Sequence, residues 1–110
     1  MMEANKKYRT IFICQPAYNF SSLASVCDGM TFLVTGSEVS LEQTLKACRS
    51  NLTGFDPEKD ALLMVGKVNI SFIVGVVLRE LVPADKTITM GIYIKPKDRE
   101  SYYRWESVTL

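Results

Sequence analysis

Residues 60–81 constrain the fold of this chain more than any other part of the sequence. They read DALLMVGKVNISFIVGVVLREL, in which a short apolar run stops at Gly66 and a longer apolar run resumes after a polar step. A short apolar run before a turn is typical of a buried strand, and a longer run is typical of a buried helix. The segment therefore predicts a βα unit whose turn carries Lys67, Asn69 and Ser71.

The second half of this unit also has features of a strand. Ile70 and Phe72 alternate with Asn69 and Ser71, and β-branched residues, which favour strands, are common here. We predict a helix over 69–82, because about fourteen residues exceed the usual length of a strand. A helix also continues the alternation of strands and helices that is predicted upstream.

Two more strands and a helix are predicted in the N-terminal half. Apolar and β-branched residues predict strands over 8–14 and 30–35, in addition to the strand over 61–66. Ser40 and Gln43 form a Ser-x-x-Gln capping box, and apolar residues follow at helical spacing. We therefore predict a helix over 40–52.

Two further segments complete the secondary structure. Residues 20–26 favour a short helix, and a hairpin turn at Asp28-Gly29 is the alternative. Clean alternation of apolar and polar residues predicts a strand over 87–95, and the turn that follows it leads into a partner strand over 101–109.

These elements together predict an α/β fold, with three βα units on a mainly parallel sheet closed by a C-terminal antiparallel β-hairpin. The chain has 110 residues, of which 47% are apolar, so it suits a single domain over 1–110 that buries its own core. The apolar pattern predicts that the most buried residues include Ile11, Ile13, Phe32, Val34, Leu45, Leu63, Val65, Ile73, Val77 and Ile92.

Charge and cysteine content narrow the classes of protein that fit. The net charge of +1 provides no strong field toward nucleic acid or a membrane surface, and it lets copies of the chain approach one another. Cys14, Cys27 and Cys48 are odd in number and lack C-x-x-C spacing, which predicts buried free thiols in a reducing compartment. With a polar N-terminus and short apolar runs, the chain is expected to be cytoplasmic, without a membrane span.

The residues that build common catalytic and metal sites are scarce. The chain contains no histidine, so the most frequent general base and metal ligand is missing. Asp56, Glu58 and Asp60 cluster around a proline, where a solvated loop is favoured over an acid/base pair. We therefore identify no catalytic residue and expect no metal or cofactor.

The carboxyl edge of the predicted sheet offers a possible ligand site. Turns that lead from parallel strands into helices meet at this edge, where helix N-termini favour anions. The turns here have single glycines and lack the phosphate-binding motifs, so capping and turn formation are the competing interpretation. A small-ligand protein that binds a nucleotide or another phosphate compound would use Tyr18, Asn19, Ser37, Lys67, Asn69 and Ser71.

The predicted C-terminal hairpin offers a possible interaction surface. Aromatic and arginine residues are frequent anchors of protein interfaces, and the same mixture can stack on bases and pair with phosphates. Asp98, Glu100 and Glu106 dilute the positive charge, so nucleic acid is the weaker interpretation, and half of the side chains could instead cover the core. The candidate contact residues are Lys97, Arg99, Tyr103, Arg104 and Trp105.

The layout of the chain from residue 30 to residue 108 resembles small phage-encoded accessory proteins of unassigned function. The likeness lies in D-x-L-L-x-x-G over 60–66, the apolar helix that follows and the closing hairpin with Y-Y-x-W over 102–105. It implies a viral origin and carries over no active site.

The sequence thus favours a non-enzymatic accessory protein that binds a protein partner or its own copy through the hairpin. A nucleotide-binding protein is the second hypothesis, and weak nucleic-acid binding through the hairpin is the third.

Overall fold

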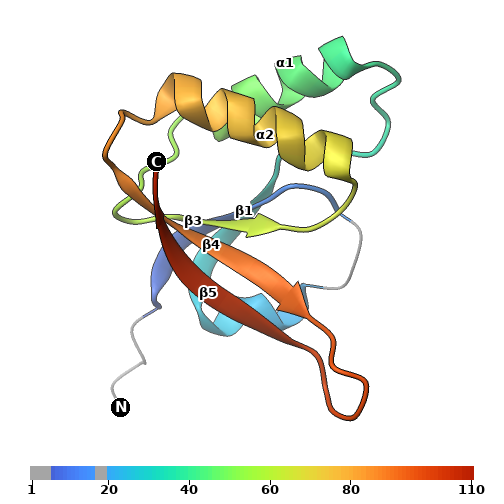
Figure 1. Cartoon of the computed structure of the whole chain (residues 1–110), viewed down its shortest axis with the longest axis vertical. Coiled ribbons are helices and arrows are strands. Elements are labelled where there is room, and N and C mark those ends of the chain that lie inside the picture. The colour runs from blue at the N-terminus through green and yellow to red at the C-terminus, as the bar shows by residue number, and fades with distance from the viewer. Residues whose placement is uncertain (1–5, 17–19) are drawn as a thin grey trace.

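A computed structural model describes residues 6–16 and 20–110 of the chain (Figure 1). Its five strands lie in the order β2-β1-β3-β4-β5, and β5 is antiparallel to β4 while the neighbouring pairs among the other strands are parallel. The predicted α/β fold with a mainly parallel sheet and a C-terminal hairpin is confirmed. The elements are β1 (Tyr8–Ile13), the short 3-10 helix η1 (Ser21–Ser25), β2 (Cys27–Phe32), α1 (Leu41–Leu52), β3 (Ala61–Met64), α2 (Val68–Leu81), β4 (Thr87–Ile94) and β5 (Tyr102–Thr109).

The two faces of the sheet are covered unequally. The chain passes from β1 to its neighbour β2, then returns past β1 to β3 and continues to β4. Right-handed crossovers therefore place η1 on one face and both α1 and α2 on the other, as Figure 1 shows. The helix face buries a continuous cluster that includes Phe12, Leu62 and Val74, whereas η1 covers a smaller cluster around Ile11 and Leu63.

Both long helices form where the sequence predicts them. Ser40 is the N-cap of α1, and its hydroxyl accepts a hydrogen bond from the Gln43 N–H at 3.1 Å. The Gln43 side chain in turn accepts from the Val39 N–H at 2.9 Å, so the capping box satisfies two otherwise free donors. Residues 68–81 are helical, which confirms a helix over the strand alternative.

The predicted strand over 30–35 is shifted in the structure. β2 begins at Cys27, whose partner is Tyr8 of β1, and Gly29 pairs with Thr10 within the same ladder. The ladder begins this early because η1 is short, so the chain returns to the sheet at once. Asp28-Gly29 consequently lies inside a strand and forms no hairpin turn, and the short-helix interpretation of 20–26 is the correct one.

Most of the predicted core is buried, with three exceptions. Phe32 is 40% exposed because β2 is an edge strand, and its ring packs against that of Phe20, the residue before η1, at 5.9 Å. Leu45 and Ile92 are half-buried, since Leu45 borders the gap between α1 and α2 and Ile92 lies toward the end of β4. The other seven predicted residues are buried.

Asp60 corrects the interpretation of residues 56–60 as a solvated loop. Its side chain is buried at the start of β3, and the carboxylate accepts hydrogen bonds from the Arg9 guanidinium at 2.6 and 3.0 Å. The Thr10 and Asp56 N–H groups donate to the same carboxylate at 3.2 and 2.8 Å. A fully hydrogen-bonded carboxylate of this kind fastens the beginnings of β1 and β3 together.

Candidate functional site

Glu38 occupies the turn that follows β2 at the carboxyl edge. Its carboxylate accepts hydrogen bonds from the Thr35 and Gly36 N–H groups, each at 3.0 Å, and from the Thr35 hydroxyl at 3.0 Å. These backbone hydrogen bonds, led by the one from Thr35, lower the pKa of the Glu38 carboxyl below its ordinary value. A carboxylate of the chain itself thus takes the position that an anionic ligand would need in this turn.

The side chain of Gln15, which follows β1, lies in the turn between β3 and α2. Its side-chain oxygen accepts the Lys67 N–H at 3.1 Å, and it lies so close to Gly66 that a Cβ there would be 2.2 Å from it. Gly66 has a φ of 106°, which glycine adopts readily and other residues do not. The backbone N–H of Lys67, a residue predicted to bind a ligand, is therefore already hydrogen-bonded within the chain.

The residues predicted to bind a ligand lie on separate parts of the carboxyl edge. Ser37 follows β2, and Lys67 follows β3 with β1 between the two strands. Lys67 is the N-cap of α2, and Asn69 and Ser71 lie within the helix, so the prediction that the turn carries these two residues is wrong. Tyr18 and Asn19 lie outside the described residues.

The hairpin brings aromatic side chains together on the face of the sheet that η1 partly covers. The Trp105 ring packs directly over Gly91, the residue opposite it on β4, and lies 5.2 Å from the Tyr8 ring. The Tyr103 ring lies 5.7 Å from the Tyr93 ring. Tyr103 and Trp105 are half-buried, so these two predicted contact residues also cover the core.

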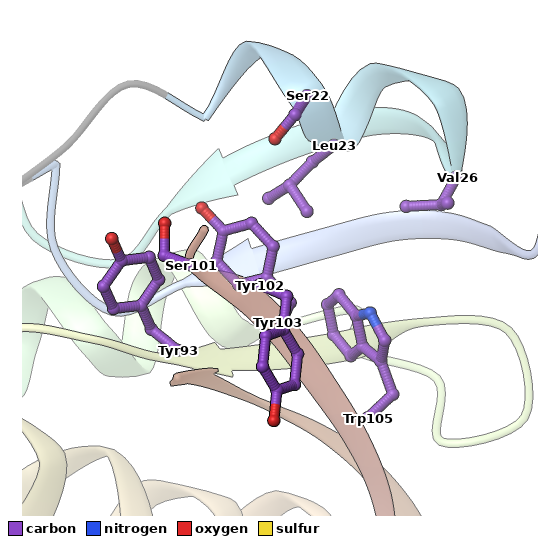
Figure 2. A pocket seen from close by; sticks show the side chains of 8 residues that line it. All are labelled: Ser22, Leu23, Val26, Tyr93, Ser101, Tyr102, Tyr103 and Trp105. Atoms are coloured by element: carbon purple, nitrogen blue, oxygen red, sulfur yellow. The ribbon is translucent and has the colours of Figure 1, made fainter. Parts of the chain in front are cut away.

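A hollow of about 420 Å³ lies between η1 and the hairpin. Figure 2 shows Ser22, Leu23 and Val26 on one side of it and the aromatic side chains of β4 and β5 on the other. Its lining is hydroxyl-rich as well as aromatic, because Tyr93, Ser101, Tyr102 and Tyr103 border it together with Trp105.

The outer side of β5, which we call the hairpin edge, has no strand beside it in the described part of the chain. The Leu110 N–H donates to the Lys86 carbonyl at 3.0 Å, and the Thr87 and Thr109 hydroxyl oxygens are 3.0 Å apart. Hydrogen-bonded and non-hydrogen-bonded residue pairs alternate along an antiparallel ladder. The N–H and C=O groups of even-numbered β5 residues, like those of Leu110, therefore point toward β4. The backbone groups that point outward belong to Tyr103, Trp105, Ser107 and Thr109.

Charged side chains occupy the opposite face of β5 and the hairpin turn. Arg104 donates from Nε to the Glu106 carboxylate at 3.1 Å, and both side chains are about half exposed. Lys97 and Arg99 are exposed in the turn, where Arg99 Nε lies 3.9 Å from the Asp98 carboxylate. The predicted contact residues therefore divide among an aromatic face, a charged face and the turn.

The structure also contains an apolar groove between α1 and α2 that was not predicted from the sequence. It has a volume of about 580 Å³, and Phe72, Val68 and Leu41 on its walls are 72%, 85% and 62% exposed. The available signal was the all-round apolarity of α2, which we interpreted as complete burial. Its apolar lining is made by Leu41, Leu45, Val68, Phe72, Ile73 and Val76, and we call it the helix groove.

Within residues 6–16 and 20–110 there is no cluster of three or more histidine, cysteine or acidic side chains that could hold a metal ion. In the same residues, no helix has the length and apolarity needed to cross a membrane. All three cysteines are buried free thiols, as predicted.

Comparison with protein-family models, curated proteins and solved structures finds no match for this chain. The resemblance to phage accessory proteins therefore stays a prediction, and the functional argument depends on the chain itself.

Proposed function

We propose that this chain is a non-enzymatic accessory protein that works through protein–protein contacts made by its C-terminal hairpin. The observation that carries this proposal is the hairpin edge. Along this strand of eight residues, the outward backbone donors and acceptors have no partner strand within residues 6–16 and 20–110. Such an edge is a template for another strand, and main-chain hydrogen bonds supply affinity in this mode of recognition.

A comparison of the two edges of the sheet favours β5 over β2 as the contact strand. β2 has six residues, and Asp28 and Gly29 in its interior are both unfavourable in strands. β5 is longer, contains neither proline nor glycine, and pairs with β4 over eight residues without a bulge. Edge strands that avoid association often carry a proline, a bulge or charged side chains, and of these features β5 has only the charged side chains of Arg104 and Glu106.

The competing hypothesis of a nucleotide site receives less support. In the turns after β2 and β3, Glu38 accepts the Thr35 and Gly36 N–H groups and Gln15 accepts the Lys67 N–H, so these three donors are already used within the chain. A nucleotide would have to displace a carboxylate from one turn and an amide oxygen from the other. A rise in melting temperature on addition of nucleotides would favour this competitor, since a ligand of the folded state stabilises it.

Substitution of Ser107 by proline tests the proposal at the backbone. The Ser107 N–H points away from β4, so Ser107→Pro removes a donor from the hairpin edge and leaves the β4–β5 hydrogen bonds in place. Ser107→Ala is the matched control, because it removes the hydroxyl and keeps the N–H. Circular dichroism and the melting temperature verify that both variants fold.

Each folded protein is then immobilised and exposed to a lysate of the cell in which the chain naturally occurs. We expect proteins that bind the wild type and Ser107→Ala to be lost from Ser107→Pro. If Ser107→Pro retains them while Phe72→Ser in the helix groove loses them, the contact surface is the groove and the proposal is wrong.

A further inference from the structure

We propose that the hairpin edge pairs with the hairpin edge of a second copy of this chain, in an antiparallel register that sets Arg104 of each copy opposite Glu106 of the other. This inference rests on the proposed function, and it names the partner and the register. It follows from the order of the residues along β5 and from which of them direct their backbone outward.

The outward backbone groups limit the possible registers. Two copies related by a two-fold axis form the same contacts twice, and most soluble homodimers have this symmetry. Odd-numbered residues of one β5 must then exchange hydrogen bonds with odd-numbered residues of the other. If the axis passes between the two Trp105 residues, Tyr103 faces Ser107 of the second copy, and Arg104 faces its Glu106.

The charges of Arg104 and Glu106 favour the register centred on Trp105 over the two neighbouring registers. Shifting the axis to Arg104 sets two arginines opposite each other, and shifting it to Glu106 sets two glutamates opposite each other. Like charges directly opposite across two strands are destabilising, whereas opposite charges are stabilising. The Trp105-centred register forms two Arg104–Glu106 pairs between the copies. The two neighbouring registers and all larger shifts form no such pair.

The backbone pattern strengthens these two pairs. Even-numbered residues of β5 form the non-hydrogen-bonded positions of the proposed interface, where facing Cα atoms are only about 4.5 Å apart and side chains approach closely. Arg104 and Glu106 are 54% and 49% exposed in the single chain, so both can turn from their present intrachain contact toward a neighbour.

The aromatic face contributes to the same interface. The two Trp105 side chains lie opposite each other at the axis, on the face where each already packs over Gly91 and beside Tyr8. Aromatic pairs across strands add to the stability of a sheet. A net charge of +1 per chain adds little repulsion between copies.

The test uses charge reversal and remixing, with mass measured by light scattering during size-exclusion chromatography. The wild type should reach twice its chain mass of 12.4 kDa as the concentration rises toward roughly 1 mM, the range of weak contacts. Arg104→Glu sets glutamates opposite Glu106, and Glu106→Arg sets arginines opposite Arg104. We expect each single variant to weaken the dimer at least tenfold.

An equimolar mixture of the two single variants should restore the dimer. One chain then carries two glutamates and the other two arginines at positions 104 and 106, so both cross-strand pairs are again complementary. The double variant Arg104→Glu/Glu106→Arg should also dimerise by itself. Arg79→Glu, at an exposed position of α2 away from β5, is the matched charge-reversal control, and it should leave the mass unchanged.

Three results would overturn the inference. The wild type could remain a monomer over the whole range, the mixture could remain monomeric although the wild type dimerises, or Phe72→Ser could abolish a dimer that Arg104→Glu leaves intact. A monomeric wild type whose lysate partners are still lost from Ser107→Pro would refute self-pairing alone. A monomeric wild type whose lysate partners also remain bound to Ser107→Pro would refute the proposed function as well.

Discussion

Asp60 illustrates, at the scale of single residues, how the chain holds a buried charge. Its carboxylate receives two hydrogen bonds from Arg9 and two from backbone N–H groups. The pairing escaped the sequence analysis because Arg9 lies 51 positions away along the chain, and no local pattern connects the two residues. The hydrogen bonds with Asp60 raise the pKa of the Arg9 guanidinium above its ordinary value, because they favour its charged form.

Removing this carboxylate should destabilise the fold strongly. Asp60→Ala deletes all four hydrogen bonds and leaves the Thr10 and Asp56 N–H groups without their acceptor. The Arg9 side chain is 47% exposed, so water can solvate its charge and the cost comes mainly from the two N–H groups. We expect a loss of about 1–3 kcal/mol in the free energy of unfolding for each of them, measured by urea denaturation. Glu58→Ala, at an exposed position of the same turn, should stay within about 0.5 kcal/mol of the wild type. Equal losses in both variants would show that Asp60 has no special role.

Glu38 provides a prediction on pH. Its pKa is lower in the folded chain than its ordinary value, because backbone N–H groups hydrogen-bond its charged form. A carboxyl group whose pKa is lower in the folded chain than in the unfolded chain stabilises the fold at pH values above the unfolded-state pKa. This contribution is lost as the pH falls through the pKa of the folded state. In an acid titration followed by NMR, the Thr35 and Gly36 amide signals should move with an apparent pKa below the ordinary value of a glutamate side chain. Glu38→Gln should remove that transition, and its persistence would assign it to another group.

At the scale of elements, local signals were sufficient for the helices and insufficient for β2. The capping box of α1 and the length of the apolar run in α2 depend on neighbouring residues, so both helices could be predicted. The limits of β2 depend on pairing with β1, where the ladder begins at Cys27 opposite Tyr8. Strand pairing is non-local, so the residues of β2 alone do not specify where it starts.

The turn between β3 and α2 gives a prediction that combines backbone and side chain. Gly66→Ala should lower the free energy of unfolding by about 1–3 kcal/mol from backbone strain alone, since the φ of 106° excludes most residues. Contact of the new Cβ with Gln15 adds to this loss.

A double-mutant cycle separates the two causes. Gln15→Ala removes the side-chain oxygen that would lie 2.2 Å from the new Cβ and keeps only the residue-15 Cβ at 2.9 Å. Gln15→Ala/Gly66→Ala should therefore lose less stability than the sum of the single variants. Strict additivity in urea denaturation would mean that the Gln15 contact is unimportant and that strain alone acts.

The whole molecule joins two unequal cores across one sheet, and this asymmetry determines where surfaces remain open. The helix face is covered by α1 and α2, whereas the other face is covered by a five-residue 3-10 helix and by the aromatic side chains of the hairpin. The composition of the hairpin identified it as a candidate site from the sequence. The outward-pointing residues of β5 could not be identified that way, because they depend on the β4–β5 register.

The three buried thiols can report how the two cores open. Cys14 and Cys48 lie in the larger cluster under α1 and α2, where burial raises their pKa values to about 12 and about 11. Cys27 lies in the smaller cluster beside η1, and burial raises its pKa as well. Thiolate is the reactive form, so all three should react slowly with a thiol reagent at neutral pH.

Low concentrations of urea should distinguish the two clusters. Segments with little apolar cover open locally before the whole fold does. We expect the thiol of Cys27 to react first and those of Cys14 and Cys48 to react only on global unfolding, in variants that keep one cysteine each and replace the others by alanine. Because the helix face is one continuous cluster, Cys14 and Cys48 should share the same dependence on urea. If Cys48 reacted as early as Cys27, α1 would open independently of the sheet, and the helix face would not be a single cooperative core.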